Sequence, residues 1–304
     1  MKRNLKRLRF KIYLYFSHRD LSANGKEFCM YKKIYLEITN ICNLDCSFCH
    51  KTKREKKFLS KEDFSFLAEK IRPYTDYLYL HLMGEPLIHP ELTDILGIAH
   101  TLGFHTTVAT NGVRIKEAEA ALLSASLYKI TFSLHSYEAN SSIQKSLTEY
   151  INDIISFCKK AERNGSICVL RLWNEGGENE LNSEIISLLK KEFTFRENRK
   201  GYTLSDKIYL EEAEKFIWPD ENAPTQDVHF CMGLRDHIGV LSDGSVVPCC
   251  LDADGSIVLG NLFNEDLDSI IKSDRARNIY DGFSEGKARE ELCRRCQYAT
   301  RFKS

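Results

Sequence analysis

Three cysteines, Cys42, Cys46 and Cys49, lie within eight residues, directly after the apolar run at residues 34–39. Three thiolates can hold three corners of one inorganic centre, and they leave the fourth corner without a cysteine. Structural zinc usually has four protein ligands. The triplet therefore predicts an iron–sulfur centre with an open position, with a zinc site as the alternative. His50 could close the fourth corner, as a non-enzymatic electron carrier or redox sensor would require.

The cysteine content of the chain indicates metal binding. Hydrophobic residues make up 43% of the 304 residues, which is enough for a packed core. Eleven cysteines in a chain of this length favour metal sites in a cytoplasmic protein over a disulfide framework. Cys158 and Cys168 suit small buried positions. No run of about 18 apolar residues occurs, so we expect no membrane span. Residues 1–16 are basic and then apolar, but no signal-peptide cleavage site follows them.

From residue 33 the chain alternates between strand and helix patterns. The predicted strands span residues 33–39, 77–82, 104–109, 128–134 and 167–172. The predicted helices span residues 60–71, 91–102, 115–124 and 143–164. Residues 180–191 and 193–195 suit one more helix and strand. Five or six such units predict an α/β fold with a parallel sheet and helices outside it.

Polar residues follow the predicted strands, where barrels of this type carry their functional side chains. The triplet follows the first strand, and the sequence from His81 to Pro86 follows the second. The later strands are followed or ended by these residues: Thr110, Asn111, Gly112, Ser133, His135 and Arg171. Each alone suits a turn or a packing position. Together, behind a cysteine triplet, they predict one site.

The triplet, Phe48 before its last cysteine, and the motif Gly84-Glu85-Pro86 resemble the signature of radical S-adenosylmethionine (radical SAM) enzymes. The resemblance implies a partial (β/α)6 barrel of the TIM type and a 4Fe–4S cluster whose open iron binds S-adenosylmethionine. It also implies that the motif contacts the methionine amino group, and that Ser133 contacts the ribose or carboxylate. Met83 replaces a more usual glycine, and residues 136–150 lack an arginine for the carboxylate. The cofactor-binding residues expected on this basis are Phe48, Gly84, Glu85, Pro86, Asn111 and Ser133.

A second set of cysteines lies beyond residue 228. The turn Asp243-Gly244 between two apolar runs predicts a hairpin. The hairpin would bring Cys249 back beside the start of the hairpin's own first strand. Four thiols are then available: Cys231, Cys249 or Cys250, Cys293 and Cys296. On ligand chemistry alone they suit zinc and a second iron–sulfur cluster equally.

The spacing Cys231-x12-Gly244-x4-Cys249 resembles the opening of a SPASM domain, a C-terminal extension of some radical SAM enzymes that binds auxiliary 4Fe–4S clusters. The resemblance selects Cys249 over Cys250. No cysteine follows Cys296, which indicates a shortened version with one auxiliary cluster and a full set of ligands. The expected domains are a basic lead (1–30), a radical SAM partial barrel (31–227) and a SPASM-like auxiliary cluster domain (228–304).

The resemblance implies a radical SAM oxidoreductase or maturase. Its reaction would begin with cleavage of S-adenosylmethionine to a 5′-deoxyadenosyl radical, which removes a substrate hydrogen. An auxiliary cluster near the substrate suggests a two-electron oxidation or a peptide or protein modification. A low-potential electron donor such as flavodoxin or ferredoxin is implied. His135 and Arg171 are candidate general bases, although packing suits both equally well.

The substrate is open between a peptide or protein, a small molecule and an RNA. RNA is considered because the basic lead could combine with a second basic cluster into a phosphate-binding face. That cluster consists of Lys51, Lys53, Arg54, Lys56 and Lys57. The formal net charge of zero gives no global signal for nucleic acid.

Overall fold

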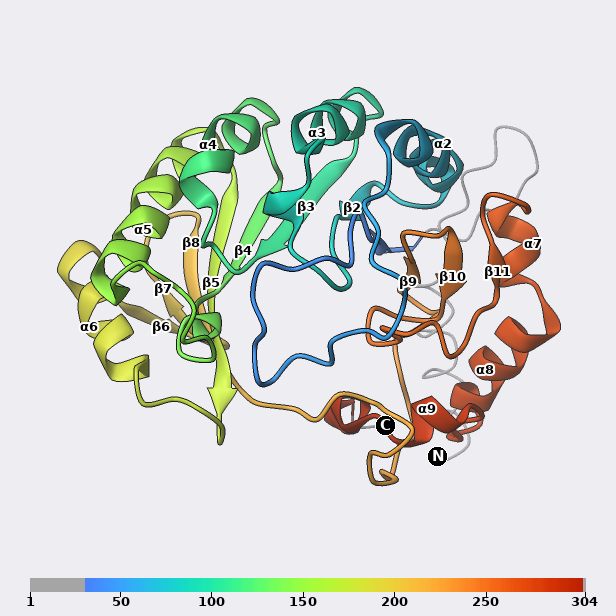
Figure 1. The fold of residues 1–304 in the computed structure, drawn as a ribbon. Coiled ribbons are helices and arrows are strands. Elements are labelled where there is room, and N and C mark those ends of the chain that lie inside the picture. The colour runs from blue at the N-terminus through green and yellow to red at the C-terminus, as the bar shows by residue number, and fades with distance from the viewer. Residues whose placement is uncertain (1–30, 303–304) are drawn as a thin grey trace, which may run out of the picture.

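A computed structural model describes residues 31–302, so the predicted basic lead at residues 1–30 lies outside the described part (Figure 1). Strands form a curved sheet, and helices lie along its outer side. The barrel elements are β1 (Lys33–Leu36), α2 (Lys61–Ile71), β2 (Tyr77–Tyr79), α3 (Leu92–Thr101), β3 (His105–Thr110), α4 (Ile115–Ser124), β4 (Lys129–Ser133), α5 (Leu147–Arg163), β5 (Ile167–Glu175), α6 (Asn182–Glu192), β6 (Arg196–Asn198), β7 (Gly201–Thr203) and β8 (Ile208–Glu214).

The remaining elements belong to the C-terminal segment and to short 3-10 turns. The C-terminal elements are β9 (His237–Val240), β10 (Ser245–Val247), β11 (Gly260–Asn261), α7 (Leu267–Ile271), α8 (Asp274–Ser284) and α9 (Glu291–Arg294). The 3-10 turns are η1 (Arg72–Tyr74), η2 (Pro86–Ile88), η3 (Leu134–Ser136) and η4 (Gln297–Arg301).

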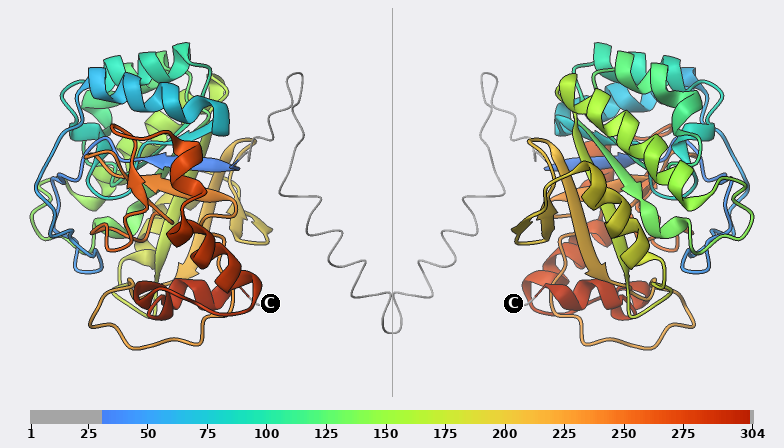
Figure 2. Two further views of the ribbon diagram at one scale, coloured as in Figure 1. Left: turned by 90° about the vertical axis from the view of Figure 1, so that its right-hand side faces the viewer. Right: turned by 90° about the vertical axis from the view of Figure 1, so that its left-hand side faces the viewer.

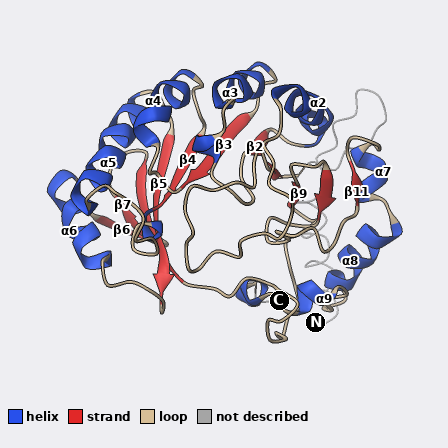
Figure 3. Cartoon of the chain, in the orientation of Figure 1, coloured by secondary structure: helices blue, strands red, loops and turns tan. Residues whose placement is uncertain are grey.

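The parallel part of the sheet forms the predicted partial barrel. The described strands follow the order β11-β10-β9-β1-β2-β3-β4-β5-β8-β7-β6. Six of them, β1 to β5 and then β8, pair in parallel with one another in this order. Figure 3 shows the helices outside this arc and the loops crossing its open side. The α/β partial-barrel prediction is confirmed.

The sixth parallel strand is not the one that the sequence predicted. Residues 193–195 form no strand; the chain instead makes the antiparallel β6–β7 hairpin and then β8, which pairs with β5. Ile208 and Leu210 of β8 are buried, but Glu211 and two further glutamates interrupt the apolar pattern. Glu211 lies 3.5 Å from the Nε atom of Arg171 on β5, a long-range contact that the local sequence does not indicate.

Serine caps set the starts of two helices. The Oγ atom of Ser60 accepts a hydrogen bond from the backbone N–H of Asp63 over 3.1 Å, as predicted for α2. Ser146 accepts one from Glu149 over 3.2 Å. Helix α5 therefore starts at Leu147, four residues later than the predicted start at residue 143.

The C-terminal segment extends the barrel sheet. The predicted hairpin forms between β9 and β10, and Val247 pairs with Gly239. Strand β9 also pairs in parallel with β1, with Tyr35 opposite Gly239. Figure 2 shows the orange and red C-terminal elements beside the blue strand β1. One hydrophobic core runs from Ile34 on β1 to Phe283 on α8, so barrel and C-terminal segment fold around shared apolar side chains.

The helices are those of a packed α/β protein. Within residues 31–302, none is long and apolar enough to cross a membrane.

Candidate functional site

The cysteine triplet lies in the long loop between β1 and α2, which crosses the open side of the barrel in Figure 1. Cys42 is exposed, Cys46 is buried and Cys49 is half-buried. Burial raises the pKa of all three thiols, that of Cys42 to about 11. They would therefore stay protonated at neutral pH unless a positive centre held them as thiolates. Such a donor set fits a metal cluster.

Asn140 positions this loop, although no local sequence pattern indicates such a role for it. Its Nδ2 atom donates to Sγ of Cys46 over 3.0 Å and to the carbonyl of Ser136 over 2.7 Å. Its Oδ1 atom accepts from the backbone N–H of Asp45 over 2.8 Å. Both amide hydrogens and the amide oxygen are thus used. Asn140 follows β4, so it ties a distant loop to the triplet.

Gly84 allows the loop after β2 to approach the start of the cysteine loop. Its φ angle is +74°, and a Cβ atom there would lie 2.4 Å from the carbonyl oxygen of Thr39 and 2.8 Å from that of Ile41. The next residue, Glu85, donates its backbone N–H to Ile41 over 2.8 Å. Glycine is therefore required by both conformation and space.

The carboxylate of Glu85 joins the loops after β2 and β3. It accepts hydrogen bonds from the backbone N–H of Leu87 (2.9 Å), the hydroxyl of Thr110 (2.7 Å) and the backbone N–H of Asn111 (2.7 Å). Burial raises the pKa of Glu85 to about 7, despite these three donors. Pro86 follows it and begins the η2 turn. This acid therefore holds the expected cofactor loops in place.

Two other expected cofactor residues, Asn111 and Phe48, lie at the cysteine loop, and a third, Ser133, ends β4. Asn111 donates from Nδ2 to Oδ1 of Asn43 over 2.9 Å, one residue from Cys42. The ring of Phe48 lies 4.8 Å from the ring of His135, between centroids. Ser133 ends β4, opposite Arg171 on β5. The structure thus brings together loops that are far apart in sequence.

The two candidate bases have different surroundings. Nδ1 of His135 lies 3.1 Å from the carbonyl of Arg171 and 3.4 Å from the backbone nitrogen of Trp173, so strand β5 holds this ring. Burial lowers the pKa of His135 to about 4. The guanidinium of Arg171 stacks on Trp173 at 4.2 Å and lies near Glu211. These contacts support packing and positioning roles for both residues.

The imidazole of His50, the candidate fourth cluster ligand, contacts the C-terminal segment. Its Nε2 atom lies 2.8 Å from Oδ2 of Asp254 in the C-terminal segment. Asp254 also accepts from the hydroxyl of Thr52 over 2.7 Å and the backbone N–H of Lys53 over 2.8 Å. The residues after the triplet are therefore attached to the C-terminal segment. This contact favours an open fourth corner over the electron-carrier alternative.

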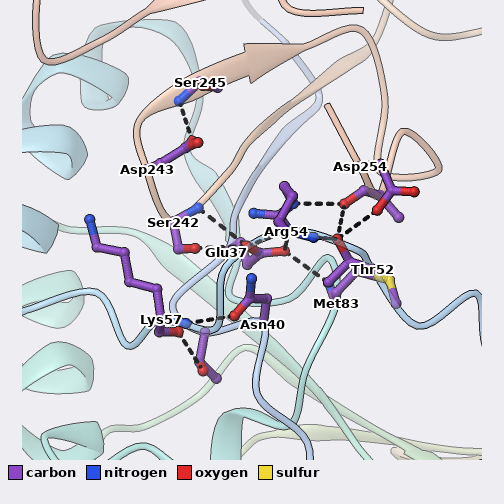
Figure 4. A network of polar contacts seen from close by, with 12 residues as sticks. Glu37, Asn40, Thr52, Arg54, Lys57, Met83, Ser242, Asp243, Ser245 and Asp254 are labelled. Carbon is purple, nitrogen blue, oxygen red and sulfur yellow. Dashed lines mark hydrogen bonds and ion pairs between the residues drawn. The ribbon is translucent and has the colours of Figure 1, made fainter. Parts of the chain in front are cut away.

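A buried ion pair fastens the same loop to the barrel (Figure 4). The Arg54 guanidinium donates to both carboxylate oxygens of Glu37, over 2.8 and 2.7 Å. Glu37 is fully buried and also accepts from the Oγ and backbone N–H groups of Ser242 and from the backbone N–H of Met83. A glutamate inside the apolar run at residues 34–39 was the sequence signal for this network.

Three cations of the predicted basic cluster are paired with acids, while the basic lead that would complete the face lies outside the described residues. Arg54 is paired with Glu37, Lys51 lies 2.8 Å from Asp45, and Lys53 lies 3.3 Å from Glu221. The acids neutralise three of its five cations.

The second cysteine set surrounds one small cavity of about 30 Å³. Four of its lining residues are Cys231, Cys249, Cys293 and Cys296. Burial raises the pKa of all four thiols. Within residues 31–302 no three His, Cys, Asp or Glu side chains are arranged to hold a single metal ion. Four thiolates around one space can hold an iron–sulfur cluster.

Cys250 points elsewhere. It does not line the cavity; it packs with Tyr35, Tyr79 and their apolar neighbours on the barrel side, and Tyr35 forms a hydrogen bond with it. Gly233 allows the close approach of the cavity thiols, because a Cβ atom there would lie 3.0 Å from the carbonyl of Pro248. This geometry favours Cys249 over Cys250 as a ligand.

Two family models match the chain. The model of the radical SAM superfamily matches residues 36–189, and that of the SPASM iron–sulfur cluster-binding domain matches residues 231–297. The first membership implies a 4Fe–4S cluster with S-adenosylmethionine, and the second implies auxiliary iron–sulfur binding.

Similar proteins include GTP 3′,8-cyclases and enzymes with the same fold. The chain matches about a third of the length of the probable cyclases of Saccharolobus islandicus. It is 27% identical over 276 residues to the GTP 3′,8-cyclase of Aquifex aeolicus, covering 74% of this chain and 83% of that one.

Solved structures with the same fold include those of BtrN and SuiB. BtrN in complex with AdoMet and 2-DOIA has a TM-score of 0.59 at 15% identity, covering 89% of this chain and 94% of that one. Streptococcus suis SuiB bound to S-adenosylmethionine has a TM-score of 0.60 at 17% identity, covering 89% and 71%. The fold, the two cysteine sets and the family matches agree. This chain belongs to the radical SAM superfamily and carries a C-terminal SPASM domain.

Proposed function

We propose that this enzyme removes a hydrogen atom from its substrate and completes a two-electron oxidation or a peptide or protein modification. The observation that carries the proposal is the difference between the two cysteine sets. The loop after β1 offers three thiols, whereas four thiols line the C-terminal cavity. Three ligands leave an iron open for S-adenosylmethionine, and four leave none open. The second cluster would then accept an electron instead of binding substrate.

Cys42, Cys46 and Cys49 would hold the first 4Fe–4S cluster. When bound, this cluster and S-adenosylmethionine supply the 5′-deoxyadenosyl radical. The chain's own residues position the cofactor: Gly84 permits close loop approach, the Glu85 carboxylate joins two loops, and the buried surroundings limit access of water. Phe48, Pro86, Asn111 and Ser133 complete the proposed cofactor site.

Cys231, Cys249, Cys293 and Cys296 would hold the auxiliary 4Fe–4S cluster. The proposed enzyme also needs a low-potential electron donor, such as flavodoxin or ferredoxin, and a reducing, cytoplasmic environment. A peptide or a small molecule is supported as substrate by two proteins that share the fold, SuiB bound to precursor peptide SuiA and BtrN bound to 2-DOIA.

A phosphorylated nucleotide is the second candidate substrate. The long match to the GTP 3′,8-cyclase of Aquifex aeolicus favours it. Incubation of the reduced holoenzyme with GTP would separate the candidates, because a cyclised nucleotide product would identify this reaction.

The proposal is tested with anaerobically reconstituted, reduced protein and S-adenosylmethionine. We expect a changed electron paramagnetic resonance spectrum and formation of 5′-deoxyadenosine. A variant with Cys42, Cys46 and Cys49 replaced by alanine should show neither. An unchanged spectrum with no 5′-deoxyadenosine in the wild type would instead support an electron carrier. Substrate-dependent 5′-deoxyadenosine without an oxidised or crosslinked product would contradict the two-electron oxidation.

A further inference from the structure

The inner face of the barrel sheet carries polar atoms without partners. Within the described residues, five buried side-chain nitrogen or oxygen atoms lack a hydrogen-bond partner. Three of them are Nδ1 of His81, Oγ1 of Thr107 and Nε of Arg171. They come from the loop directly after β2, from β3 and from β5. Buried polar atoms normally have partners, so three such atoms on one part of the sheet, from the end of β2 to β5, indicate a missing polar ligand.

Strand alternation places these side chains on one face. Leu80, Val108 and Leu170 pack in the main core between sheet and helices. Side chains next to them in sequence point to the opposite face of the sheet, toward the barrel interior. His81, Thr107 and Arg171 are the immediate neighbours of these core residues. All three therefore face the interior.

Lys129, which has no acidic partner among the described residues, extends across the same inner face of the sheet. Lys129 on β4 pairs with Thr107 on β3, which pairs with Tyr79 on β2. Its Nζ atom donates to the hydroxyl of Tyr79 over 3.1 Å, so the side chain extends across β3. Lys129 forms no ion pair within the described part of the chain. Its positive charge is therefore available to a bound anion.

His81 adds a neutral polar group to this positive surface. Its ring lies 5.4 Å from the ring of Tyr35 and 5.6 Å from that of Tyr79, between centroids. Burial, together with the nearby cations Arg171, Lys129 and Lys33, lowers the pKa of His81 to about 3. A neutral imidazole can donate one hydrogen bond without adding charge.

We propose that this inner face binds an anionic group of the substrate, a carboxylate or a phosphate, through His81, Thr107, Lys129 and Arg171. The available atoms can all donate hydrogen bonds. Arg171 is already paired with Glu211, whereas Lys129 supplies a positive charge that no acid of the described residues balances. This inference rests on the proposed function for its assignment to a substrate. The location suits that role, because Arg171 lies opposite Ser133, one of the expected cofactor residues, across β4 and β5.

Binding of simple anions tests the proposal without a known substrate. Anaerobically purified holoenzyme is dialysed to equilibrium against radiolabelled inorganic phosphate and, separately, radiolabelled acetate. Each measurement is made first without and then with S-adenosylmethionine. We expect saturable binding of one anion per chain. Phosphate binding would indicate a phosphorylated substrate, and acetate binding would indicate a carboxylate.

Three variants define where the anion binds. Lys129→Met should weaken binding about tenfold or more, since a hydrogen bond to a charged group contributes about 1.5–3 kcal/mol. Thr107→Val keeps the shape of the side chain and should weaken binding by a smaller factor. Lys190→Met, an exposed position on α6, is the matched control and should change nothing. Unchanged iron content and S-adenosylmethionine binding would show that each variant folds.

Three results would overturn the inference: binding of neither anion, equal binding by Lys129→Met and the wild type, or displacement of the anion by S-adenosylmethionine. The last would assign the site to the cofactor carboxylate. The test is independent of radical formation. Anion binding in a protein that never makes 5′-deoxyadenosine would contradict the proposed function and leave the anion site in place.

Discussion

The side-chain amide of Asn140 donates a hydrogen bond to the Sγ atom of Cys46 over 3.0 Å. The two residues lie 94 positions apart, in the loops after β4 and β1. Hydrogen bonds to cysteine sulfur are among the features that set the reduction potential of an iron–sulfur cluster. By withdrawing electron density from sulfur, this one would stabilise the reduced cluster.

Asn140→Ala should therefore make the reduction potential of the first cluster more negative. We expect a three- to tenfold smaller equilibrium constant for reduction, or roughly 30–60 mV, since tenfold corresponds to about 59 mV for one electron. A redox titration followed by electron paramagnetic resonance measures this. The auxiliary cluster in the same sample is the internal control. An unchanged first-cluster potential would show that Asn140 only packs against the loop.

Arg54→Met should destabilise the protein by about 3–5 kcal/mol, because it leaves the fully buried carboxylate of Glu37 without its cation. Lys53→Met is the matched control. Its pair with Glu221 is exposed and screened by solvent, so its loss should change the free energy of unfolding far less. Urea denaturation of the anaerobic holoenzyme measures both. Equal effects would mean that the buried pair contributes no more than a surface pair.

Cys249→Ser should remove the auxiliary cluster, whereas Cys250→Ser should keep it. The reason is that Cys249 lines the cavity and Cys250 packs beside Tyr35. Iron and sulfide analysis should show a loss of about half the iron in the first variant and none in the second, since each 4Fe–4S cluster holds four. The reverse pattern would exchange the two assignments.

Glu85 should make stability fall with rising pH. Its pKa is raised from 4.5 to about 7 in the folded protein. Between these values the folded state keeps a proton that the unfolded state releases. The stabilisation is thus complete below pH 4.5 and is lost as the pH rises through about 7, by up to about 1.4 kcal/mol per pH unit.

The matched comparison is Glu85→Gln, which cannot titrate. Its free energy of unfolding should lack this component between pH 5 and about 7, when measured by urea denaturation at several pH values. Parallel pH profiles for the two proteins would show that Glu85 does not carry the effect.

Gly84→Ala should weaken S-adenosylmethionine binding by about tenfold or more, because a Cβ atom 2.4 Å from the Thr39 carbonyl forces the loop to move. Gly97→Ala on α3 is the control. A Cβ atom there meets nothing within 4 Å, and alanine should stabilise the helix by about 0.5–1 kcal/mol. Equilibrium dialysis with labelled S-adenosylmethionine measures the first effect. Unaltered binding in Gly84→Ala would exclude a close-approach role.

Local patterns predicted the features that depend on neighbouring residues. The Ser60 cap, the Asp243-Gly244 hairpin and the alternation of strands and helices all follow from short-range chemistry. Strand β8 escaped prediction because its glutamates interrupt the apolar pattern, and the contact of Glu211 with Arg171 comes from another strand. The local sequence of β8 does not show that an arginine from another strand will pair with Glu211.

The sequence by itself determined the partial-barrel class and the two sets of cysteines, because spacing and periodicity are properties of the chain. Only the tertiary structure decided that β9 pairs with β1, that Asn140 reaches Cys46, and that His50 turns to Asp254. It also separated Cys249 from Cys250, two adjacent thiols with equal ligand chemistry. These outcomes depend on which distant segments pack together, since burial and hydrogen bonding are satisfied across the whole fold.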